Sequence, residues 1–514
     1  MLDTFKNTGL KKEYVLNAFF FLFLGIIILH RFILFFSIKL DYIDNDEVVI
    51  WLGAKHYSEG LFYVPRFYGQ SYHTMMDALF SVPLIKSGVP VYYAVPILTQ
   101  LIYLTPFIFS AFFLFYKKKK ETAIIVLCIM LCMPVGYDIM NTITRGFANG
   151  LFFTTFLIVS LHNPQNKIYI GINVFMAYVG YLVLPNSVLV TLPVLFYLFL
   201  LNYKNKLFYV ASAVALICGM PFDYLLNHFY KIHPEAEISK YKTEFGFNYL
   251  IDSIKHLDAQ FTHIGFFVEE SSFITLLVLG ALGVFLYKKS LNHFYAFLVF
   301  ICILLLGFST NKSIDGSMWP FYSYSRLYLG IPIIIYLFIA MLNPIPNKFI
   351  YFICFITIGF TVFKYATFTQ KIAYHVDEKK WNHLNLISLK DLKGCLEVYK
   401  NQCQKNKVTN LLIIDHVWRD DFINYAGPAL YEDYPNTFKP SFERRSWRIA
   451  EEKNLIHTSF QIYSANWNLD SIFSQSHPDI NITRIDDYGS FLIKNNHLTT
   501  VQFLKKIGAT MEGF

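Results

Sequence analysis

Acidic side chains gather in the first long polar segment of the chain. Asp46 and Glu47 close the cluster DYIDNDE and precede the amphipathic segment VVIWLGAKHYSEG. We expect this segment to lie along a membrane surface, where a nearby carboxylate is partly desolvated and suited to act as a general base. The alternative is that the acidic residues are simply solvated, which is the interpretation we adopt for Asp41 and Asp44.

A second polar series follows in the stretch FYGQSYHTMMDALFSVP. Tyr68, Gln70, Tyr72 and His73 combine hydrogen-bonding groups with flat apolar faces, and sugars need both kinds of contact. An aromatic belt at the membrane interface would explain the tyrosines, but not Gln70 or the spacing to the next acid. That acid, Asp77, can cap the apolar helix that follows or contact a substrate. The stretch is therefore predicted to belong to a sugar-binding surface.

Cationic residues stand at the predicted outer ends of helices. Arg145 and Arg326 can each pair bidentately with a phosphate, or can snorkel to lipid headgroups. His30 and Arg31 lie near the outer part of the first apolar run, where an ionisable residue is a functional candidate that can also snorkel. Asp138, in the predicted outer loop 137–146, is a candidate second acid.

The elements that must position these residues are membrane-spanning helices. The chain has 514 residues, of which 55% are hydrophobic and only 16% are charged, against ~25% charged residues in an average soluble domain. About eleven apolar runs approach the ~20 residues needed to cross a bilayer. These candidate spans fall near 15–38, 93–116, 121–136, 147–161, 168–184, 187–202, 207–222, 272–287, 293–309, 327–343 and 349–366. The predicted fold class is an α-helical polytopic membrane protein.

The basic residues indicate an orientation in the membrane. Lysines precede the first span and recur in every second short loop, as in KKKK at 117–120, and such loops face the cytoplasm. The N-terminus is therefore predicted to be cytoplasmic, with loops 39–92, 137–146 and 310–326 on the outer face. The first span is too long for a signal-peptide core and lacks a small-residue cleavage site, so we expect it to be retained.

The remainder of the chain resembles an ordinary soluble domain in composition. We predict a transmembrane domain over residues 1–368 and an extracytoplasmic α/β or α+β domain over 369–514. In the latter, NLLIIDHVW is typical of a buried strand, and 420–428 and 444–454 are candidate helices. An extracytoplasmic location would permit a disulfide between Cys395 and Cys403, although on one straight helix these residues would lie ~12 Å apart, too far to bridge.

The net charge of +8 does not indicate nucleic-acid binding, because the basic residues lie mainly in short loops between spans. No Gly-rich phosphate loop or zinc-finger spacing stands out, and the His and Cys residues show no metal-ligand spacing. We therefore predict that no cofactor is required, with a divalent metal ion as the open alternative.

The motifs also resemble a known family. An acidic pair in the first outer loop, a short helix, YGQ-x-Y and an acid followed by Ala resemble the polyprenyl-phosphate-sugar glycosyltransferases of the GT-C superfamily. This family includes the dolichyl-phosphate-mannose-protein mannosyltransferases and the lipid A aminoarabinose transferases. The resemblance is clearest over residues 40–100 and weaker at TRGFANG and YSYSRLYLGIP, where a Leu separates Arg326 from Tyr328.

The resemblance implies a large-loop fold of eleven or more helices with its active site on the outer face of the bacterial cytoplasmic membrane. It implies a polyprenyl-phosphate sugar as donor and a glycan, lipid or protein as acceptor, in contact with membrane lipids and without nucleic acid. A carboxylate deprotonates the acceptor hydroxyl, which attacks the anomeric carbon, usually with inversion. By analogy Asp46 is the first choice for that base and Glu47 the second.

Three other functions are alternatives to a glycosyltransferase. A transporter or flippase of lipid-linked glycans would line its path with charged residues, and these spans are poor in them. A polymerase or ligase of surface polysaccharide would not be expected to place an acidic pair directly after the first span. A structural or receptor role for the tail, with the membrane half as its anchor, would need only one ~20-residue helix, far fewer than the predicted eleven.

Overall fold

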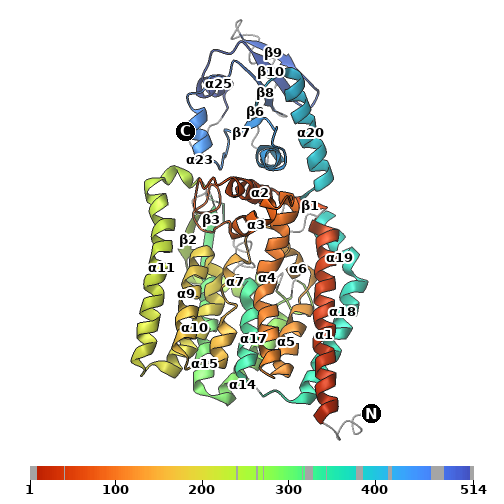
Figure 1. The fold of residues 1–514 in the computed structure, drawn as a ribbon, viewed down its shortest axis with the longest axis vertical. Helices are drawn as coiled ribbons and strands as arrows, with labels where there is room; N and C mark the ends of the chain where they lie inside the picture. The colour runs from red at the N-terminus through yellow and green to blue at the C-terminus, as the bar shows by residue number, and fades with distance from the viewer. Residues whose placement is uncertain are drawn as a thin grey trace.

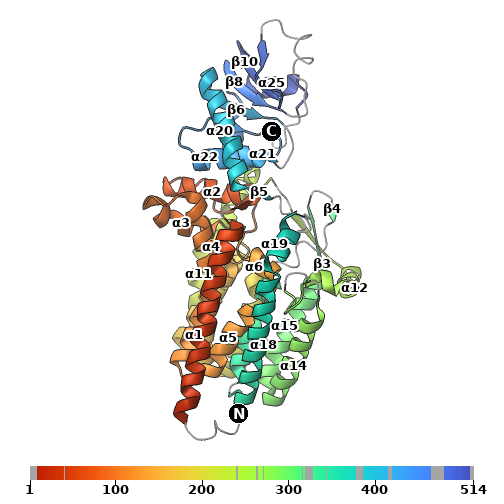
Figure 2. The ribbon, with the colours of Figure 1, turned by 90° about the vertical axis from the view of Figure 1, so that its right-hand side faces the viewer.

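The computed structural model describes residues 9–39, 41–238, 241–261, 264–269, 271–314, 317–318, 328–342, 344–377, 386–414, 419–464 and 480–509, and the statements below concern these residues. Residues 9–377 form a helical region, and residues 386–509 form a second region, the tail. Figures 1 and 2 show the helical region as a long bundle, with the N-terminus at one end and the tail at the other.

Helices make up most of the helical region. They are α1 (Gly9–Leu34), the π-helical segment η2 (Phe35–Lys39), α2 (Asn45–Ser58), α3 (Met76–Lys86), α4 (Val91–Tyr116), α5 (Lys120–Leu131), α6 (Val135–Met140), α7 (Asn149–Phe152), α8 (Leu157–His162), α9 (Lys167–Val183), η3 (Pro185–Ser187), α10 (Val188–Asn202), α11 (Lys206–Ile232), η4 (Pro234–Ala236), α12 (Phe247–Lys255), α13 (Leu257–Gln260), α14 (Phe273–Lys289), α15 (Leu291–Phe308), η5 (Tyr328–Gly330), α17 (Ile331–Leu342), α18 (Asn347–Ala366) and α19 (Phe368–Asp377). A small antiparallel sheet pairs β2 (Tyr241–Phe245), β3 (Thr310–Ile314) and β4 (Ser317–Met318) in that order.

Six helices of the described chain are long and apolar enough to cross a membrane, by length and composition: Lys12–Lys39, Val91–Tyr116, Pro185–Asn202, Lys206–Ile232, Leu291–Phe308 and Lys348–Ala366. Helix occurs in each predicted range, so the predicted fold class is confirmed. About eleven full-length spans is an overestimate by the same criterion, because several ranges hold shorter helices. The range 147–161, for example, is divided between α7 and α8. Helix α5 ends three residues before Pro134, because proline in a helix interior lacks the backbone N–H and disfavours helix at the preceding residue.

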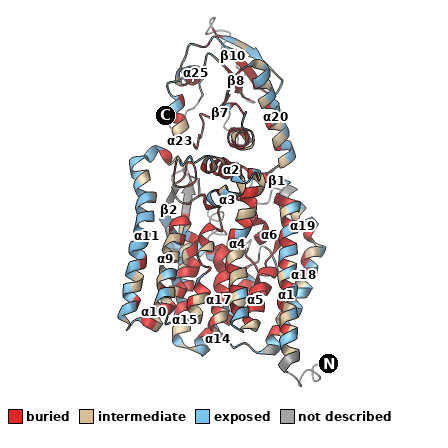
Figure 3. Ribbon diagram, viewed as in Figure 1, coloured by how far each residue is buried: buried red, intermediate tan, exposed pale blue. Residues whose placement is uncertain are grey.

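The burial pattern fits a lipid-facing exterior. Figure 3 shows the outer helix α11 mostly exposed and the inner helices α5 and α17 mostly buried. On α11 the exposed side chains include Val210, Val214 and Ile217. Apolar side chains in such a continuous exposed stripe indicate contact with lipid rather than with water.

Helix α2 runs crosswise between the bundle and the tail (Figure 1). It contacts α3 and α4 on one side, and η6 and α22 of the tail on the other. Its residues Val48 to Leu52 are all buried. The expectation that this segment lies along the membrane surface stays a prediction, but the burial of these residues comes from protein, because the tail covers one side of the helix.

The tail is an α/β unit with one mixed sheet. Its helices and helical turns are α20 (Leu389–Asn406), α21 (Arg419–Asp421), η6 (Phe422–Ala426), α22 (Gly427–Leu430), α23 (Ser446–Glu452) and α25 (Thr500–Lys506). The sheet has the order β7-β6-β8-β10-β9, with β6 (Asn410–Ile413) parallel to β7 (Asn436–Phe438) and β8 (Ser459–Tyr463), and β10 (Ser490–Lys494) antiparallel to β8 and β9 (Asn481–Arg484). Within the predicted strand range 410–418, β6 covers Asn410–Ile413, and residues 415–418 lie outside the described residues. Helix occurs in both candidate ranges, 420–428 and 444–454.

Two further features of the tail bear on the predictions. Cys395 and Cys403 are both free and both lie on α20, so the disulfide considered from the sequence is not formed, as the spacing on one helix requires. Strand β1 (Tyr42–Asp44) pairs antiparallel with β5 (Leu386–Ser388). This pairing attaches the start of the tail directly to the acidic cluster.

Candidate active site

The site is built around Asp46 in the first turn of α2. Asp44 is the N-cap of this helix, and its carboxylate accepts a hydrogen bond of 3.1 Å from the backbone N–H of Asp46. Carboxylates favour this position because the N-terminal N–H groups of a helix lack partners within the helix. The cap and the β1–β5 pairing therefore fix where the two carboxylates lie.

Two arginines from distant parts of the chain meet at Asp46. Arg145, which lies between α6 and α7, forms an ion pair with Asp46 and places its Nε 3.2 Å from Oδ2 of Asp44. Arg444, from the tail, places Nη1 2.8 Å from Oδ1 of Asp46. The Asp46 side chain retains 17% exposure, against 7% for Arg145 and 8% for Arg444. Asp46 therefore lies between the helical region and the tail, held by one cation from each.

These cations set the protonation state of Asp46. Burial alone would raise the pKa of its carboxyl, but the guanidinium groups of Arg145 and Arg444 outweigh burial and hold that pKa well below its usual range. Asp46 is therefore ionised throughout the neutral pH range.

The two arginines also have donors to spare. Nη1 of Arg145 and Nε of Arg444 are buried and have no hydrogen-bond partner among the described residues. A buried donor without a partner costs free energy, so a bound acceptor would be favoured there. Guanidinium groups match phosphate and carboxylate oxygens in geometry and charge. The pair can therefore accept an anionic group next to Asp46.

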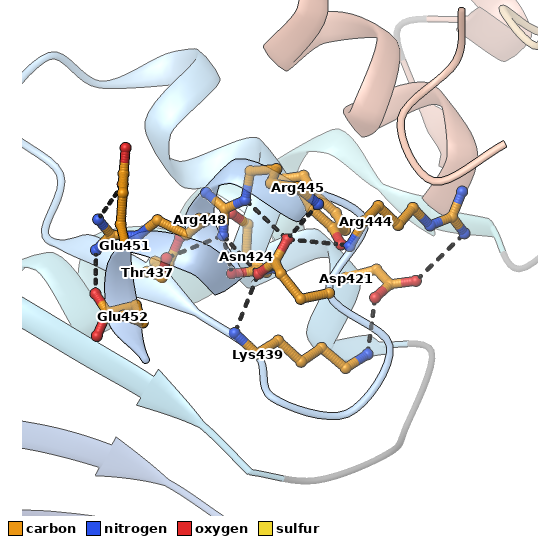
Figure 4. Close-up of polar contacts among 11 residues, drawn as sticks. Asp421, Asn424, Thr437, Lys439, Arg444, Arg445, Arg448, Glu451 and Glu452 are labelled. Atoms are coloured by element: carbon orange, nitrogen blue, oxygen red, sulfur yellow. Dashed lines mark hydrogen bonds and ion pairs between the residues drawn. The ribbon is translucent and has the colours of Figure 1, made fainter. Parts of the chain in front are cut away.

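A buried network in the tail positions Arg444 (Figure 4). Glu443 accepts bonds of 2.8 Å from both Nε and Nη2 of Arg445, and the backbone N–H of Arg444 donates to the Tyr425 hydroxyl over 3.0 Å. Asp421 pairs with Lys439 over 2.7 Å and lies 3.7 Å from Nη2 of Arg444. In Figure 4 the two neighbouring arginines diverge, with Arg445 turned into the tail and Arg444 reaching toward the N-terminal ribbon.

The stretch YGQ provides the surface against which Arg444 packs. Gly69 has φ +77°, and a Cβ built there would meet Cβ of Arg444 at 3.2 Å. Its carbonyl accepts a bond from the backbone N–H of Ile238, and the carbonyl of Gln70 accepts one from the Tyr230 hydroxyl. Glycine is favoured here both by the left-handed backbone and by the close approach of the arginine.

The aromatic residues of the stretch divide between two sides. The ring of His73 lies 4.7 Å from Phe67 and 4.7 Å from Tyr72, and its Cδ2 is 3.5 Å from the position of a Cβ on Gly146, next to Arg145. Tyr72 and His73 therefore lie on the Arg145 side of the site. Tyr68 is fully buried on the other side, with its hydroxyl 2.9 Å from Nδ1 of His56.

Glu47 is sealed off from Asp46 despite following it directly. Its carboxylate forms an ion pair with Lys39, and both side chains are 0% exposed. Burial raises the pKa of Glu47 to about 7, even though Lys39 opposes the shift. That pKa would suit a base near neutral pH, but the carboxylate has no open path to an acceptor.

Asp77 is buried in the first turn of α3 and does not cap it. The N-cap position belongs to Met75, which makes no capping bond with its side chain. The Asp77 carboxylate instead accepts bonds from Thr99 of α4, over 3.1 Å, and from Asn149 of α7. Burial raises the pKa of Asp77. Of the two sequence interpretations, the helix cap is wrong, and substrate contact stays a prediction.

Asp138 belongs to a separate cluster. It lies on α6 rather than in an open loop and is 0% exposed. Its carboxylate pairs with His30 Nε2 and Arg31 Nη2, both over 2.8 Å, and with Lys364 of α18. His30 and Arg31 therefore point into the bundle instead of snorkelling. Within the described chain, no ion pair joins Asp138 to Asp46 or Arg145.

Sequence reasoning singled out Asp46 and Arg145 but missed three charged partners. Its interpretation of Asp44 as simply solvated is wrong, because this side chain is 0% exposed and pairs with Arg145. Arg444, Lys39 and Lys364 had no motif to mark them. The run ERRSWR, three arginines and a Trp in six residues of an otherwise ordinary domain, was the available signal for Arg444. Arg326 lies outside the described residues, so its predicted role stays a prediction. Among the described residues, no group of three or more His, Cys, Asp or Glu side chains could hold a metal ion.

Comparisons with known proteins add little to this geometry. No protein-family model and no curated protein matches the chain. Among solved structures, the chain is similar to the crystal structure of ArnT from Cupriavidus metallidurans in the apo state, with 11% sequence identity and a TM-score of 0.45 over 92% of this chain and 97% of that chain. The function proposed below therefore rests on the side chains of the site.

Proposed function

We propose that the protein is an integral membrane glycosyltransferase. It would transfer a glycosyl group from a polyprenyl-phosphate sugar to an acceptor hydroxyl. The observation that supports this most directly is the arrangement of Asp46 between Arg145 and Arg444. It combines an accessible carboxylate with two cations that have unpartnered donors. These are the groups that such a transfer needs: a base for the acceptor, and fixed charge for a phosphate leaving group.

In the proposed reaction the donor phosphate binds Arg145 and Arg444. The acceptor oxygen forms a bond to the anomeric carbon from the side opposite the phosphate, and the bond from that carbon to the phosphate oxygen breaks. The electron pair of the broken bond leaves on the phosphate, where the two guanidinium groups stabilise it. The acceptor proton passes to Asp46, and the configuration inverts.

Donor binding would also strengthen the base. Without a donor, Arg145 and Arg444 hold the pKa of Asp46 below its usual range. A bound phosphate would compete for both arginines, and burial would then raise that pKa. Asp46 would thus become a better proton acceptor once the donor is in place. Glu47 is the second choice, because its pair with Lys39 is closed to solvent.

The remaining assignments follow the same proposal. Tyr72 and His73, beside Arg145, would contact the sugar, with Tyr68, Gln70 and Asp77 holding the surrounding wall. We place the site on the outer face of the bacterial cytoplasmic membrane, with the N-terminus in the cytoplasm, because the lysine-rich short loops alternate along the chain. The partners would be the lipid-linked donor, a glycan, lipid or protein acceptor, and membrane lipids. No cofactor is proposed.

One observation favours the second candidate, a transporter or flippase of lipid-linked glycans. His30, Arg31 and Lys364 lie within candidate spans and converge on the buried Asp138. Charged groups at such depth commonly mark a transport path. His30, Arg31 and Lys364 are each bonded to Asp138, however, and such a paired cluster is also typical of a structural ion-pair network within the bundle.

The test is turnover by purified protein in detergent, with a panel of polyprenyl-phosphate sugars as donors and a membrane extract as acceptor. Free polyprenyl phosphate should be released by the wild type and by Asp41→Asn, a control in the same acidic cluster, but largely lost in a folded Asp46→Asn variant. Release that survives Asp46→Asn would move the base to another carboxylate. No release with any donor, together with flipping of a lipid-linked glycan in liposomes, would favour the transporter.

A further inference from the structure

A second polar cleft lies between the C-terminal half of α2 and the tail. It has a volume of about 460 Å³, and its lining includes Lys55, His56, Tyr63, Arg445, Trp447 and Glu451. Along α2, His56 is about 15 Å from Asp46 at the helical rise per residue. The cleft is therefore distinct from the site around Asp46. The two are adjacent through the tail, because Arg444 pairs with Asp46 and the next residue, Arg445, lines the cleft.

The cleft contains a group of stacked aromatic rings. Tyr63 and Trp447 lie parallel, 4.1 Å apart with an interplanar angle of 4°. His56 lies 5.1 Å from Tyr63, and burial, together with Arg445 and Lys55, lowers the pKa of His56 to about 4. The imidazole is therefore neutral at neutral pH and offers polar contact without charge. Aromatic edges and faces beside uncharged hydrogen-bonding groups suit a sugar ring, which has apolar and polar sides.

The charged residues Lys55, Arg445 and Arg448 of the cleft already have carboxylate partners. Lys55 lies 3.2 Å from Glu59 and 3.6 Å from Glu432. Arg448 pairs with Glu452 over 2.7 Å and with Glu451 over 3.2 Å. Arg445 is bound by the buried Glu443. A charged ligand would have to break these pairs, whereas a neutral, hydroxyl-rich ligand can add hydrogen bonds to them.

A peptide bound as an extra strand does not fit the same cleft. Strand β7 is at the edge of the tail sheet, and its residues Asn436 and Thr437 line the cleft. The carbonyl of Thr437 already accepts a 2.9 Å bond from Nη2 of Arg445, and Pro435 just before the strand has no N–H to donate. Strand addition requires free backbone groups along the edge.

We propose that this cleft binds a neutral glycan. The inference rests on the proposed function, because the glycan would be the acceptor or part of a growing product held by the tail. A volume of a few hundred Å³ is in the usual range of small-ligand sites, so the cleft would take a short oligosaccharide.

The test uses the purified full-length protein in detergent, without any lipid donor. An array of neutral and acidic glycans is screened first, and binding is then measured by saturation-transfer NMR with maltose, cellobiose and N,N′-diacetylchitobiose as defined probes. We expect saturable binding of at least one neutral glycan. It should be weakened roughly tenfold by Trp447→Ala, the scale of one lost aromatic contact, and largely restored by Trp447→Phe.

Two further variants guard against a folding defect. Glu451→Trp adds bulk to the lining of the cleft from a side chain that is 55% exposed, so it should block binding while leaving the core intact. Tyr488→Ala removes an 80% exposed aromatic residue elsewhere in the tail and should bind like the wild type. No neutral glycan bound, preference for acidic glycans or peptides, or binding unchanged in both Trp447→Ala and Glu451→Trp would each overturn the proposal.

Failure of this proposal can be told apart from failure of the proposed function. Glycan binding is measured without a donor, and donor cleavage is measured by polyprenyl phosphate release. Polyprenyl phosphate release without glycan binding at the cleft would refute only the proposed glycan site. Glycan binding in a protein that never releases polyprenyl phosphate would refute the proposed transferase function and indicate a glycan-binding membrane protein.

Discussion

Replacing Arg444 by Gln tests whether the tail completes the active site. In the wild type, Arg145 and Arg444 face Asp44 and Asp46, while Asp421 keeps its own partner, Lys439. Arg444→Gln removes one positive charge and one spare donor without emptying the space. Arg145 alone then faces two carboxylates and an incoming phosphate.

Two magnitudes follow from this change. Loss of one preorganised donor to a developing anion typically lowers kcat about 100- to 1000-fold. Breaking a buried ion pair typically costs about 3–5 kcal/mol of stability, and we expect the low end here, because Asp46 keeps Arg145 and Asp421 keeps Lys439. The activity loss should therefore exceed what partial unfolding can explain.

The pH profile gives an independent readout. Arg444 contributes to the depressed pKa of Asp46, so its removal should raise that pKa and move the acid limb of kcat/KM to higher pH. Polyprenyl phosphate release is measured from pH 4 to 9 on protein whose fold is checked by thermal unfolding. Arg444→Lys, which keeps the charge but loses the fork, should fall between the wild type and Arg444→Gln. The exposed Arg484→Gln is the matched control. A folded Arg444→Gln variant with wild-type kcat and an unmoved acid limb would refute the role of Arg444.

Three other changes test separate parts of the structure. Gly69→Ala should lower the free energy of unfolding by roughly 1–2 kcal/mol because of its left-handed backbone, and it should also displace Arg444 and lower kcat about tenfold. Gly60→Ala is the control for backbone strain alone, because Gly60 has φ +83° and nothing within 4 Å of an added Cβ. Equal kcat in the two variants would contradict the contact between Gly69 and Arg444. Burial raises the pKa of Glu47 to about 7 in the folded protein, so folding favours the protonated carboxyl. This contribution to the free energy of unfolding is fully present below pH ~4.5 and is lost as the pH rises through 7. Thermal unfolding in detergent should show a decrease of up to about 3 kcal/mol across that window, absent in Glu47→Gln; a flat wild-type profile would count against it. Turnover should survive a metal chelator, and loss that one divalent ion restores would show that a metal is required.

Composition made the helical region predictable. Apolar runs identify spans because bilayer thickness and backbone hydrogen bonding leave few alternatives. It did not reveal which runs are short, since helix ends depend on local breaks such as the one before Pro134. The burial of α2 could not be predicted from the pattern either, because the residues that cover it, from Phe422 to Leu430, come far later in the chain.

The site was predictable only one residue at a time. Residue type and position in the chain singled out Asp46, Arg145, Asp138 and Arg31, yet they gave no information on which carboxylate pairs with which cation. The pairing depends on long-range packing. Asp138 pairs with Arg31 inside the bundle, whereas Asp46 pairs with Arg145 and Arg444. The role of Gly69 became visible only with Arg444 packed against it.

The pairing of β1 with β5 has a consequence for how the protein matures. Tyr42–Asp44 is synthesised early and must wait for Leu386–Ser388, and Asp46 must wait longer still for Arg444. Contacts between such distant segments form late in folding. If the tail is exported as proposed, the acidic cluster reaches the outer surface first and stays incomplete until Arg444 has crossed the membrane. Nascent or truncated chains that stop before Arg444 would therefore be inserted but inactive, so that the proposed catalysis begins only once the tail has been made.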